Sequence, residues 1–151
     1  EEVKNEPKTL IPRKYYWHSN EPCILIPFIY CDLGDCNSTN RHLRWIFSVY
    51  YKDSPDGLPG NDDGGTLSAW YIMSSIGLLM IPVKDYYLIG APIFEEVDIK
   101  LRDKSLKIRT ENFSRDNYVV KSVYFNGKEI SDFKIPHTLL IEGGEIVIKF
   151  Q

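Results

Sequence analysis

The 151-residue sequence has few cysteines and no long apolar run. Its three cysteines, Cys23, Cys31 and Cys36, are too few for a disulfide-rich scaffold, and no second cluster completes a zinc site. We expect structural thiols, with a Cys31–Cys36 disulfide as an alternative in an oxidising compartment. The longest apolar stretches, Cys23–Cys31 and Ile76–Val83, are far shorter than the roughly 18 residues of a membrane span, and Pro or Gly interrupts them. The sequence therefore predicts no membrane partner.

The chain also has no excess of basic residues. The chain has 18 Lys and Arg against 21 Asp and Glu, for a net charge of -3, and the basic residues are scattered. This pattern argues against nucleic-acid binding, which needs a basic surface. Hydrophobic residues make up 43% and aromatic residues 13% of the chain, enough for a packed core. The chain begins Glu1-Glu2 without Met or an apolar signal region, which suggests that upstream sequence has been removed or was never part of this chain, and the compartment stays open.

The first half of the sequence has helical patterns. Asn20-Glu21-Pro22 is typical of a helix start, with Asn20 as N-cap, and the apolar run Ile24–Tyr30 that follows predicts a helix buried on all sides. Apolar residues at i, i+3, i+4 and i+7 predict an amphipathic helix from Ser38 or Thr39 to Tyr51. A third helix, capped by Thr66, is expected to run to about Leu79.

The second half changes to short β-like runs after Pro82. Asn126-Gly127 and Gly143-Gly144, each between apolar runs, are typical of tight hairpins. We therefore predict an α+β fold in which helices precede an antiparallel β-sheet or half-sandwich, with the division at 1–82 and 83–151. The expected strands are Tyr86–Ile89, Val97–Leu101, Leu106–Thr110, Tyr118–Phe125, Leu139–Ile141 and Glu145–Phe150.

The richest turn segment, Asp53–Gly65, is the first candidate for chemistry. Asp62 and Asp63 stand directly before a Gly pair and a predicted helix, so backbone amides and two carboxylates are free to approach one ligand. Such carboxylates suit general-base activation of water or the binding of a hard cation. An ordinary solvated turn explains the same residues, and the spacing does not match an EF-hand loop.

A second candidate is Trp17-His18-Ser19-Asn20-Glu21-Pro22, just before the first predicted helix. Sugars present apolar ring faces and many hydroxyl groups, so aromatic rings beside Asn, Glu and His have the composition of a carbohydrate pocket. A helix cap with Trp17 packed in the core is the alternative.

Both segments resemble glycoside hydrolase family 92. Asp56–Tyr71 is similar to the family signature, whose members usually read Pro-Gly-Asn-Asp-Asp-Cys-Gly-Gln-Met-Ser-Ala-Trp-Tyr. Trp17–Pro22 resembles the Trp-His-Gly-Asn-Glu-Pro segment that precedes it. The order and spacing agree, and the similarity continues through Tyr87–Phe94 and the Asn126-Gly127 turn, so it spans about residues 15–151.

The resemblance implies an exo-acting, inverting α-mannosidase with a calcium ion, built as a helical α/α toroid joined to β-sandwich structure. It implies that Asp62 and Asp63 are the catalytic residues, one as general base and the other as its support, acting on a mannose-containing glycan. The residues expected to bind the sugar are Trp17, His18, Asn20, Glu21 and Asn61. The residues expected to hold calcium are Asn20, Glu21 and Asp63.

The sequence also departs from the family pattern. The family's general acid lies upstream of the first motif, so we expect it on the upstream part of the same enzyme or on a separate subunit. Cys23-Ile24-Leu25 replaces polar residues, and Ser19 replaces a Gly, a change that costs stability where φ is positive. The alternative function is a non-catalytic remnant or a carbohydrate-binding or interaction module. A split site predicts an exposed apolar face on the first helix, whereas an independent module would bury it.

Overall fold

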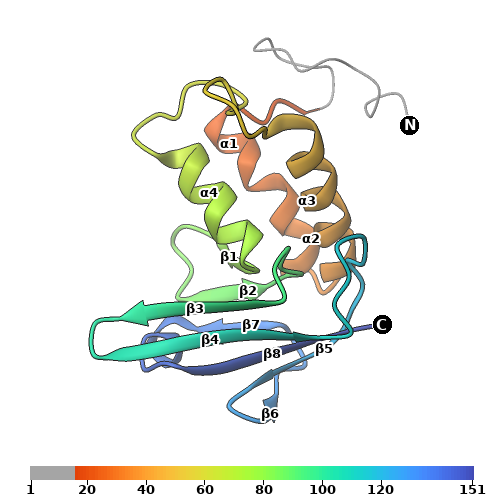
Figure 1. The fold of residues 1–151 in the computed structure, drawn as a ribbon, viewed down its shortest axis with the longest axis vertical. Coiled ribbons are helices and arrows are strands. Elements are labelled where there is room, and N and C mark those ends of the chain that lie inside the picture. The colour runs from red at the N-terminus through yellow and green to blue at the C-terminus, as the bar shows by residue number, and fades with distance from the viewer. Residues whose placement is uncertain (1–15) are drawn as a thin grey trace.

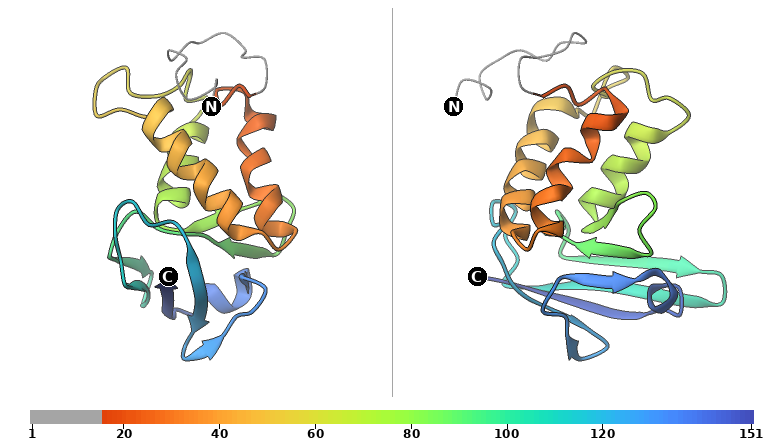
Figure 2. Two further views of the ribbon diagram at one scale, coloured as in Figure 1. Left: turned by 90° about the vertical axis from the view of Figure 1, so that its right-hand side faces the viewer. Right: turned by 180° about the vertical axis from the view of Figure 1, so that it is seen from behind.

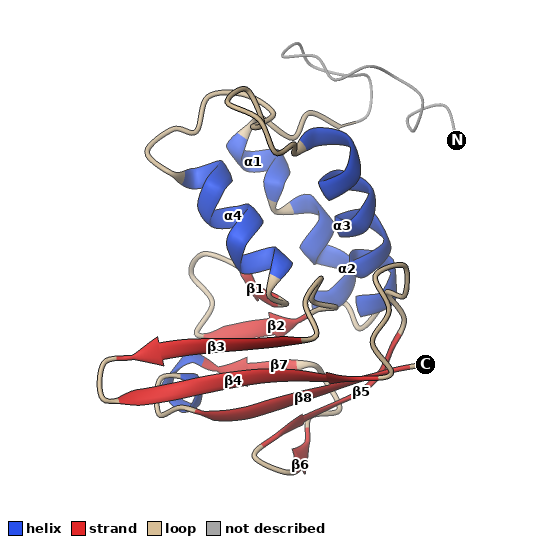
Figure 3. Cartoon of the chain, in the orientation of Figure 1, coloured by secondary structure: helices blue, strands red, loops and turns tan. Residues whose placement is uncertain are grey.

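The computed structural model describes residues 16–151 and places the helices at one end of the molecule and the strands at the other (Figure 1). Figure 3 shows the same division by element type, with one short helix, α5 (His137–Leu140), among the strands. The α+β fold class is confirmed. No helix within the described residues is both long and apolar enough to cross a membrane.

The first predicted helix is broken into three short pieces. They are α1 (Glu21–Ile24), the 3-10 helix η2 (Ile26–Phe28) and α2 (Ile29–Asp32). Pro27 lies at the break, where its missing N–H removes one helical hydrogen bond. Asn20 precedes α1, but its side chain makes no capping bond, so the predicted N-cap hydrogen bond is absent.

This helical stretch buries one face and exposes the other, so the prediction of burial on all sides is wrong. Ile24, Phe28 and Cys31 are buried. The exposed residues have helical spacing i, i+3, i+4 and i+7, and their exposed fractions range from 43% to 81%. We call this set the outer apolar face: Ile26, Ile29, Tyr30 and Leu33. In the right-hand view of Figure 2, α1 to α2 lies in front with no described element over it.

The second helix, α3 (Cys36–Tyr50), begins slightly earlier than its pattern predicted. Asp35 caps it by accepting a hydrogen bond from the Ser38 amide at 3.0 Å. A disulfide joins Cys31 of α2 to Cys36 of α3, so the expectation of free thiols holds for Cys23 alone.

The third helix, α4 (Thr66–Ser75), follows Gly65, which occupies the N-cap position in the left-handed region at φ 97°. Thr66 is thus the first helical residue and not the cap. The helix ends before Gly77, whose φ is 83° and where a Cβ would lie 2.9 Å from the Gly90 carbonyl oxygen. The chain after Gly77 continues as a strand, not as the predicted end of the helix.

The strands form two sheets. The first is antiparallel and has the order β1 (Leu78–Met80), β2 (Tyr86–Ile89), β7 (Lys134–Pro136). The second has the order β3 (Glu96–Leu101), β4 (Lys104–Glu111), β8 (Gly144–Phe150), β5 (Val120–Phe125), β6 (Lys128–Glu129). Because β4 and β8 run parallel, the second sheet is mixed and not purely antiparallel as predicted.

Of the two predicted Gly-containing hairpin turns, one is confirmed and the other is wrong. Asn126-Gly127 joins β5 to β6 with positive φ at both residues, as a tight hairpin requires, and that prediction is confirmed. Gly143-Gly144 instead leads from α5 into β8. The predicted strand Leu139–Ile141 is wrong, because helix α5 covers most of it.

The three-stranded sheet lies between two cores. Leu79 and Leu88 pack into the helical core, whereas Leu78 and Ile89 pack into the core shared with the five-stranded sheet. Alternate residues of a strand face opposite sides, so this short sheet is buried on both faces. The predicted division at residue 82 stays a prediction, but β1 before it pairs with β2 after it.

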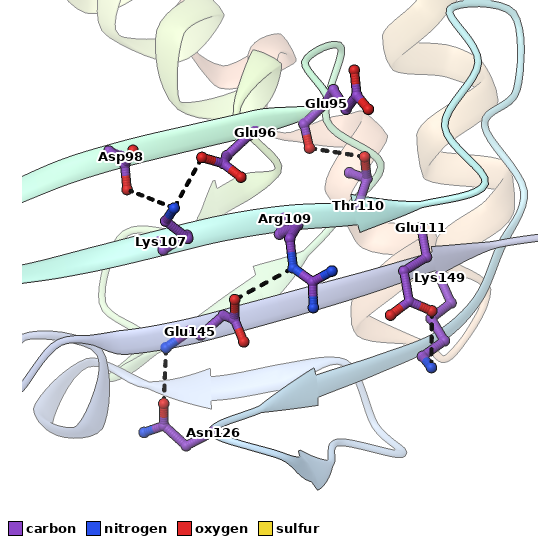
Figure 4. Close-up of polar contacts among 10 residues, drawn as sticks. All are labelled: Glu95, Glu96, Asp98, Lys107, Arg109, Thr110, Glu111, Asn126, Glu145 and Lys149. Carbon is purple, nitrogen blue, oxygen red and sulfur yellow. Dashed lines mark hydrogen bonds and ion pairs between the residues drawn. The ribbon is translucent and has the colours of Figure 1, made fainter.

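The outer side of the five-stranded sheet is charged (Figure 4). Ion pairs cross between strands, among them Lys107 with Glu96 at 2.9 Å and Lys149 with Glu111 at 2.9 Å. This face is therefore solvated, and the candidate chemistry lies at the opposite, helical end.

Candidate functional site

The two motif segments meet beyond the helix ends that lie away from the sheets (Figure 1). A Cβ on Gly60 would lie only 2.5 Å from the Ser19 Cβ, so these backbones approach closely. Trp70 on α4 donates its indole N–H to the Ile24 carbonyl at 2.9 Å and ties α4 to α1. Ser19 does not have a positive φ, so Ser in place of the family Gly causes no backbone strain.

Asp62 is the anchor of the turn that precedes α4. Its carboxylate accepts hydrogen bonds from the Ser68 amide at 2.8 Å and the Ser68 hydroxyl at 2.7 Å, one on each oxygen. Its carbonyl accepts from the amides of Gly65, Thr66 and Leu67. The bonds from Ser68, hydroxyl first, hold the pKa of Asp62 below its usual value, so this carboxylate is ionised and fixed in direction.

Asp63 lies next to this anchor in the left-handed region, at φ 48°. Such a conformation is uncommon for a non-Gly residue and is often found at functional sites. Its carbonyl accepts a hydrogen bond from the Thr66 hydroxyl at 2.9 Å, which helps to hold the turn. Its side chain is exposed.

The carboxyl groups of Asp63 and Glu21 influence each other's pKa, and this pair links the two motifs. The hydrogen bond between them raises the pKa of Asp63, and burial and the charges of Glu21 and Asp62 add to the rise. The same bond lowers the pKa of Glu21. Within the pair, Asp63 is therefore the stronger base and Glu21 the residue that stays ionised.

His18 is fully buried and bridges two tyrosines. Its Nδ1 lies 2.7 Å from the Tyr16 hydroxyl and its Nε2 lies 2.9 Å from the Tyr51 hydroxyl. Since the Tyr51 hydroxyl donates to the Leu67 carbonyl at 3.2 Å, Nε2–H of His18 is the donor to Tyr51. Burial lowers the pKa of His18 to about 3, so the ring is neutral. In this arrangement His18 orients Tyr51, and its ring is buried within the described residues.

The other predicted sugar-binding residues are less closely grouped. Trp17 is half-buried, and its buried indole N–H has no acceptor within residues 16–151. Asn20 donates from its side-chain amide to the Cys23 sulfur at 3.4 Å, which leaves its amide oxygen as a possible ligand. Asn61 is exposed beside Asp62. Ser68 and Tyr51, which sequence reasoning missed, hold this site in place; Ser68 lies inside the Ser-Ala-Trp-Tyr motif, but Tyr51 had no pattern of its own.

The site fits a calcium ion only in part. Glu21 and Asp63 bring two hard carboxyl groups together, and a cation would relieve their repulsion. Calcium takes six to eight oxygen ligands, yet the described part of the chain holds no group of three or more His, Cys, Asp or Glu residues placed to bind a metal.

Comparison with known proteins identifies the family of the chain. A family model described as the glycosyl hydrolase family 92 catalytic domain matches residues 1–151. The chain belongs to glycosyl hydrolase family 92. A secreted glycosidase of Arthroderma benhamiae is 30% identical to this family 92 chain over 131 residues, which are 84% of the chain and 17% of the relative.

Solved family 92 structures share the fold. A family GH92 α-mannosidase from Bacteroides thetaiotaomicron is 31% identical, with a TM-score of 0.83 over 90% of this chain and 19% of that protein. An inverting family GH92 mannosidase from the same organism is 28% identical, with a TM-score of 0.79 over 90% of this chain and 19% of its own. The family 92 chain thus spans about a fifth of the length of these relatives.

Proposed function

We propose that the chain is the C-terminal portion of an inverting exo-α-mannosidase that releases terminal mannose from glycans. The observation that carries this proposal is the close approach of the two family motifs: a Cβ on Gly60 would lie 2.5 Å from the Ser19 Cβ, and the carboxyl groups of Asp63 and Glu21 shift each other's pKa. The names of the two Bacteroides relatives, an α-mannosidase and an inverting mannosidase, support the substrate and the stereochemistry.

In this proposal Asp63 is the general base and Asp62 its support. A general base must be deprotonated and reach water, and its strength rises with its pKa. Asp63 is exposed and has a raised pKa, whereas each oxygen of Asp62 already accepts a bond from Ser68. Asp62 therefore fixes the turn that aims Asp63 at the water.

The general acid comes from outside this chain. An acid must be protonated before it donates to the leaving oxygen, and inverting enzymes place it across the sugar from the base. Glu21 does not serve, because its pKa is lowered. The upstream part of the enzyme, as the same chain or a separate subunit, supplies the acid in this proposal.

The outer apolar face is the docking surface for that upstream part. Its four side chains keep 43% to 81% of their surface exposed, which is a small area beside the roughly 800 Å² per partner that a stable protein interface buries. That area suits one packed helix better than a second copy of the chain. The relatives, of which this chain covers about a fifth, carry the further polypeptide that such a helix requires.

Calcium binding is part of the same proposal. Glu21 and Asp63 supply carboxylate oxygens and Asn20 supplies its amide oxygen, while water, sugar hydroxyls or the upstream part complete the set. The ion would neutralise the carboxylate pair and orient sugar hydroxyls. Trp17 and Asn61 contact the sugar, and His18 acts through Tyr51.

The test measures mannose released from an α-linked mannobiose, with calcium and then with a chelator. The chain is assayed alone and mixed with the polypeptide encoded upstream of it in the same genome. We expect calcium-dependent release in the mixture. No release in either case, with glycan binding unchanged in Asp62→Asn and Asp63→Asn, would favour the non-catalytic remnant or binding module instead.

A further inference from the structure

An open hollow of about 400 Å³ lies between the start of the Asp53–Gly65 segment and Tyr71 of α4. That volume falls in the range of small-molecule sites. Its wall and rim include Tyr51, Lys52, Asp53, Ser54, Leu58 and Tyr71. The roles proposed for Asp62, Asp63 and Glu21 use none of these side chains.

The wall of the hollow is the end of a column of aromatic rings. Trp70 stacks on Tyr51 with ring centroids 6.0 Å apart, and Tyr51 stacks on Tyr71 at 4.5 Å. Stacked rings have few ways to move, so Tyr71 offers a fixed apolar surface. The apolar C–H face of a sugar ring packs well on such a surface.

The rim of the hollow is fixed by its own backbone. The Lys52 amide donates to the Gly57 carbonyl at 3.0 Å, and the Gly57 amide donates to the Ser54 carbonyl at 2.9 Å. A Cβ on Gly57 would lie 2.1 Å from the Lys52 carbonyl oxygen, so only glycine fits. The hollow is thus formed before a ligand arrives, which lowers the entropy cost of binding.

The polar groups of the rim favour a neutral ligand rich in hydroxyls. Lys52 and Asp53 are adjacent, exposed and opposite in charge, and neither side chain bonds to another residue of the described segment. A hydroxyl group both donates and accepts, so it satisfies an ammonium and a carboxylate together. A phosphate or an amine would meet one group of its own sign.

The hollow is joined to the proposed catalytic turn through Tyr51. The Tyr51 hydroxyl donates to the Leu67 carbonyl, and the Leu67 amide donates to the Asp62 carbonyl. We propose that this hollow binds a second sugar unit of the glycan, next to the mannose at Asp63. The inference rests on the proposed function, because it assigns part of the same substrate to a new place.

The experiment compares two probes on the full chain, an α-linked mannobiose and methyl α-mannoside, by titration followed in backbone amide NMR spectra. We expect the disaccharide to shift the amides of Lys52, Asp53, Ser54 and Tyr71 and to bind about tenfold more tightly than the monosaccharide. Lys52→Ala and Asp53→Asn should remove that advantage, whereas Lys100→Ala on the distant β3 should keep it.

Tyr71→Ala tests the wall, with Tyr87→Ala as the matched half-buried control in β2. If Tyr71→Ala unfolds the chain, the two exposed rim variants still decide the matter. Shifts confined to the residues around Glu21 and Asp63 would overturn the second sugar site and leave the proposed function standing. Shifts at the hollow without mannose release in the hydrolysis assay would support the site and count against the proposed function. No shift at any amide would overturn the second sugar site, and the hydrolysis assay of the mixture would still decide the proposed function.

Discussion

At the scale of single residues, the adjacent Asp62 and Asp63 have opposite environments. Ser68 satisfies both oxygens of Asp62 and lowers its pKa, whereas Asp63 faces another carboxyl group and its pKa is raised. Pairs of titratable groups whose surroundings push their pKa values apart commonly divide catalytic roles. The hydrogen bonds that Ser68 makes to Asp62 alone thus give two adjacent Asp residues different roles.

We expect Asp63→Asn to reduce mannose release by the complete enzyme on the order of 10² to 10⁴-fold, because an amide does not accept the proton from water. Ser68→Ala should lower kcat by a smaller factor, because Asp62 then holds the turn less firmly and Asp63 is less well directed at the water. Ser68→Thr should restore kcat because it keeps the hydroxyl. Equal rates for Asp63→Asn and the wild type would rule out Asp63 as the base.

His18 makes stability depend on pH in a defined direction. Its folded pKa of about 3 lies below the ordinary value near 6.5, so the unfolded chain binds a proton that the folded chain does not. Its stabilising contribution is therefore complete above about pH 6.5 and falls as pH drops toward 3, by at most about 1.4 kcal/mol per pH unit. Urea unfolding at pH 7 and pH 5 measures this loss.

The control for His18 is the exposed His137. His18→Asn should lower stability at pH 7 and flatten its decline toward pH 5, and His137→Asn should leave the decline as it is. An unchanged slope in His18→Asn would show that His18 is not the buried group responsible.

At the scale of elements, the approach of the two motif segments depends on one small residue. Gly60 has no Cβ, and the Ser19 Cβ occupies the space that one would need. We expect Gly60→Ala to destabilise the chain by about 1 to 3 kcal/mol, since a side chain there overpacks the contact. Chemical unfolding measures the difference, with the exposed Asn61→Ala as control; an effect no larger than that of the control would mean the segments do not touch.

Sequence patterns predicted the elements with strong local signals. These signals depend only on residues that are neighbours in the sequence. They are the i, i+3, i+4 spacing of α3, the apolar run of β2 and the Asn126-Gly127 turn. The end of α4 was missed because Gly77 is fixed by its contact with Gly90, thirteen residues along the chain. Helix α5 was missed because three apolar residues fit either a strand or a helix.

The candidate site was likewise predicted where the sequence carries a local motif and missed where contacts between distant segments decide. Asp62, Asp63 and Glu21 follow from the motifs, but the contact between Asp63 and Glu21 is a tertiary one between segments about forty residues apart. No local pattern predicts it. The burial of His18 likewise depends on Tyr51 and Trp70, which come from other elements.

At the scale of the whole molecule, the outer apolar face is the surface on which the proposed upstream polypeptide packs. Its four residues keep 43% to 81% of their surface exposed within residues 16–151, where Tyr30 stacks on His42, although their spacing is that of a helix with a partner. The expectation that a split site exposes this face agrees with the structure, and an independent module that buries it does not. The charged outer side of the five-stranded sheet has no comparable surface.

We expect Leu33→Asp to abolish assembly with the upstream polypeptide, because a charge would be buried in the interface. Since Leu33 is 81% exposed, the stability of the chain itself should change by no more than about 0.5 kcal/mol. Co-purification and light scattering measure assembly, with Ile72→Asp, 58% exposed on α4, as the matched control. Equal loss in both variants would place the interface elsewhere, and concentration-dependent dimers abolished by Leu33→Asp would show a second copy there.

The central claim is that Asp63 activates water on the face of the sugar opposite the leaving group. The most direct test follows the anomer of mannose first released from mannobiose by proton NMR, with the wild-type complete enzyme and with Asp63→Asn. This mechanism gives β-mannose from the wild type and almost no release from the variant. Release of α-mannose, or β-mannose at an unchanged rate from Asp63→Asn, would contradict it.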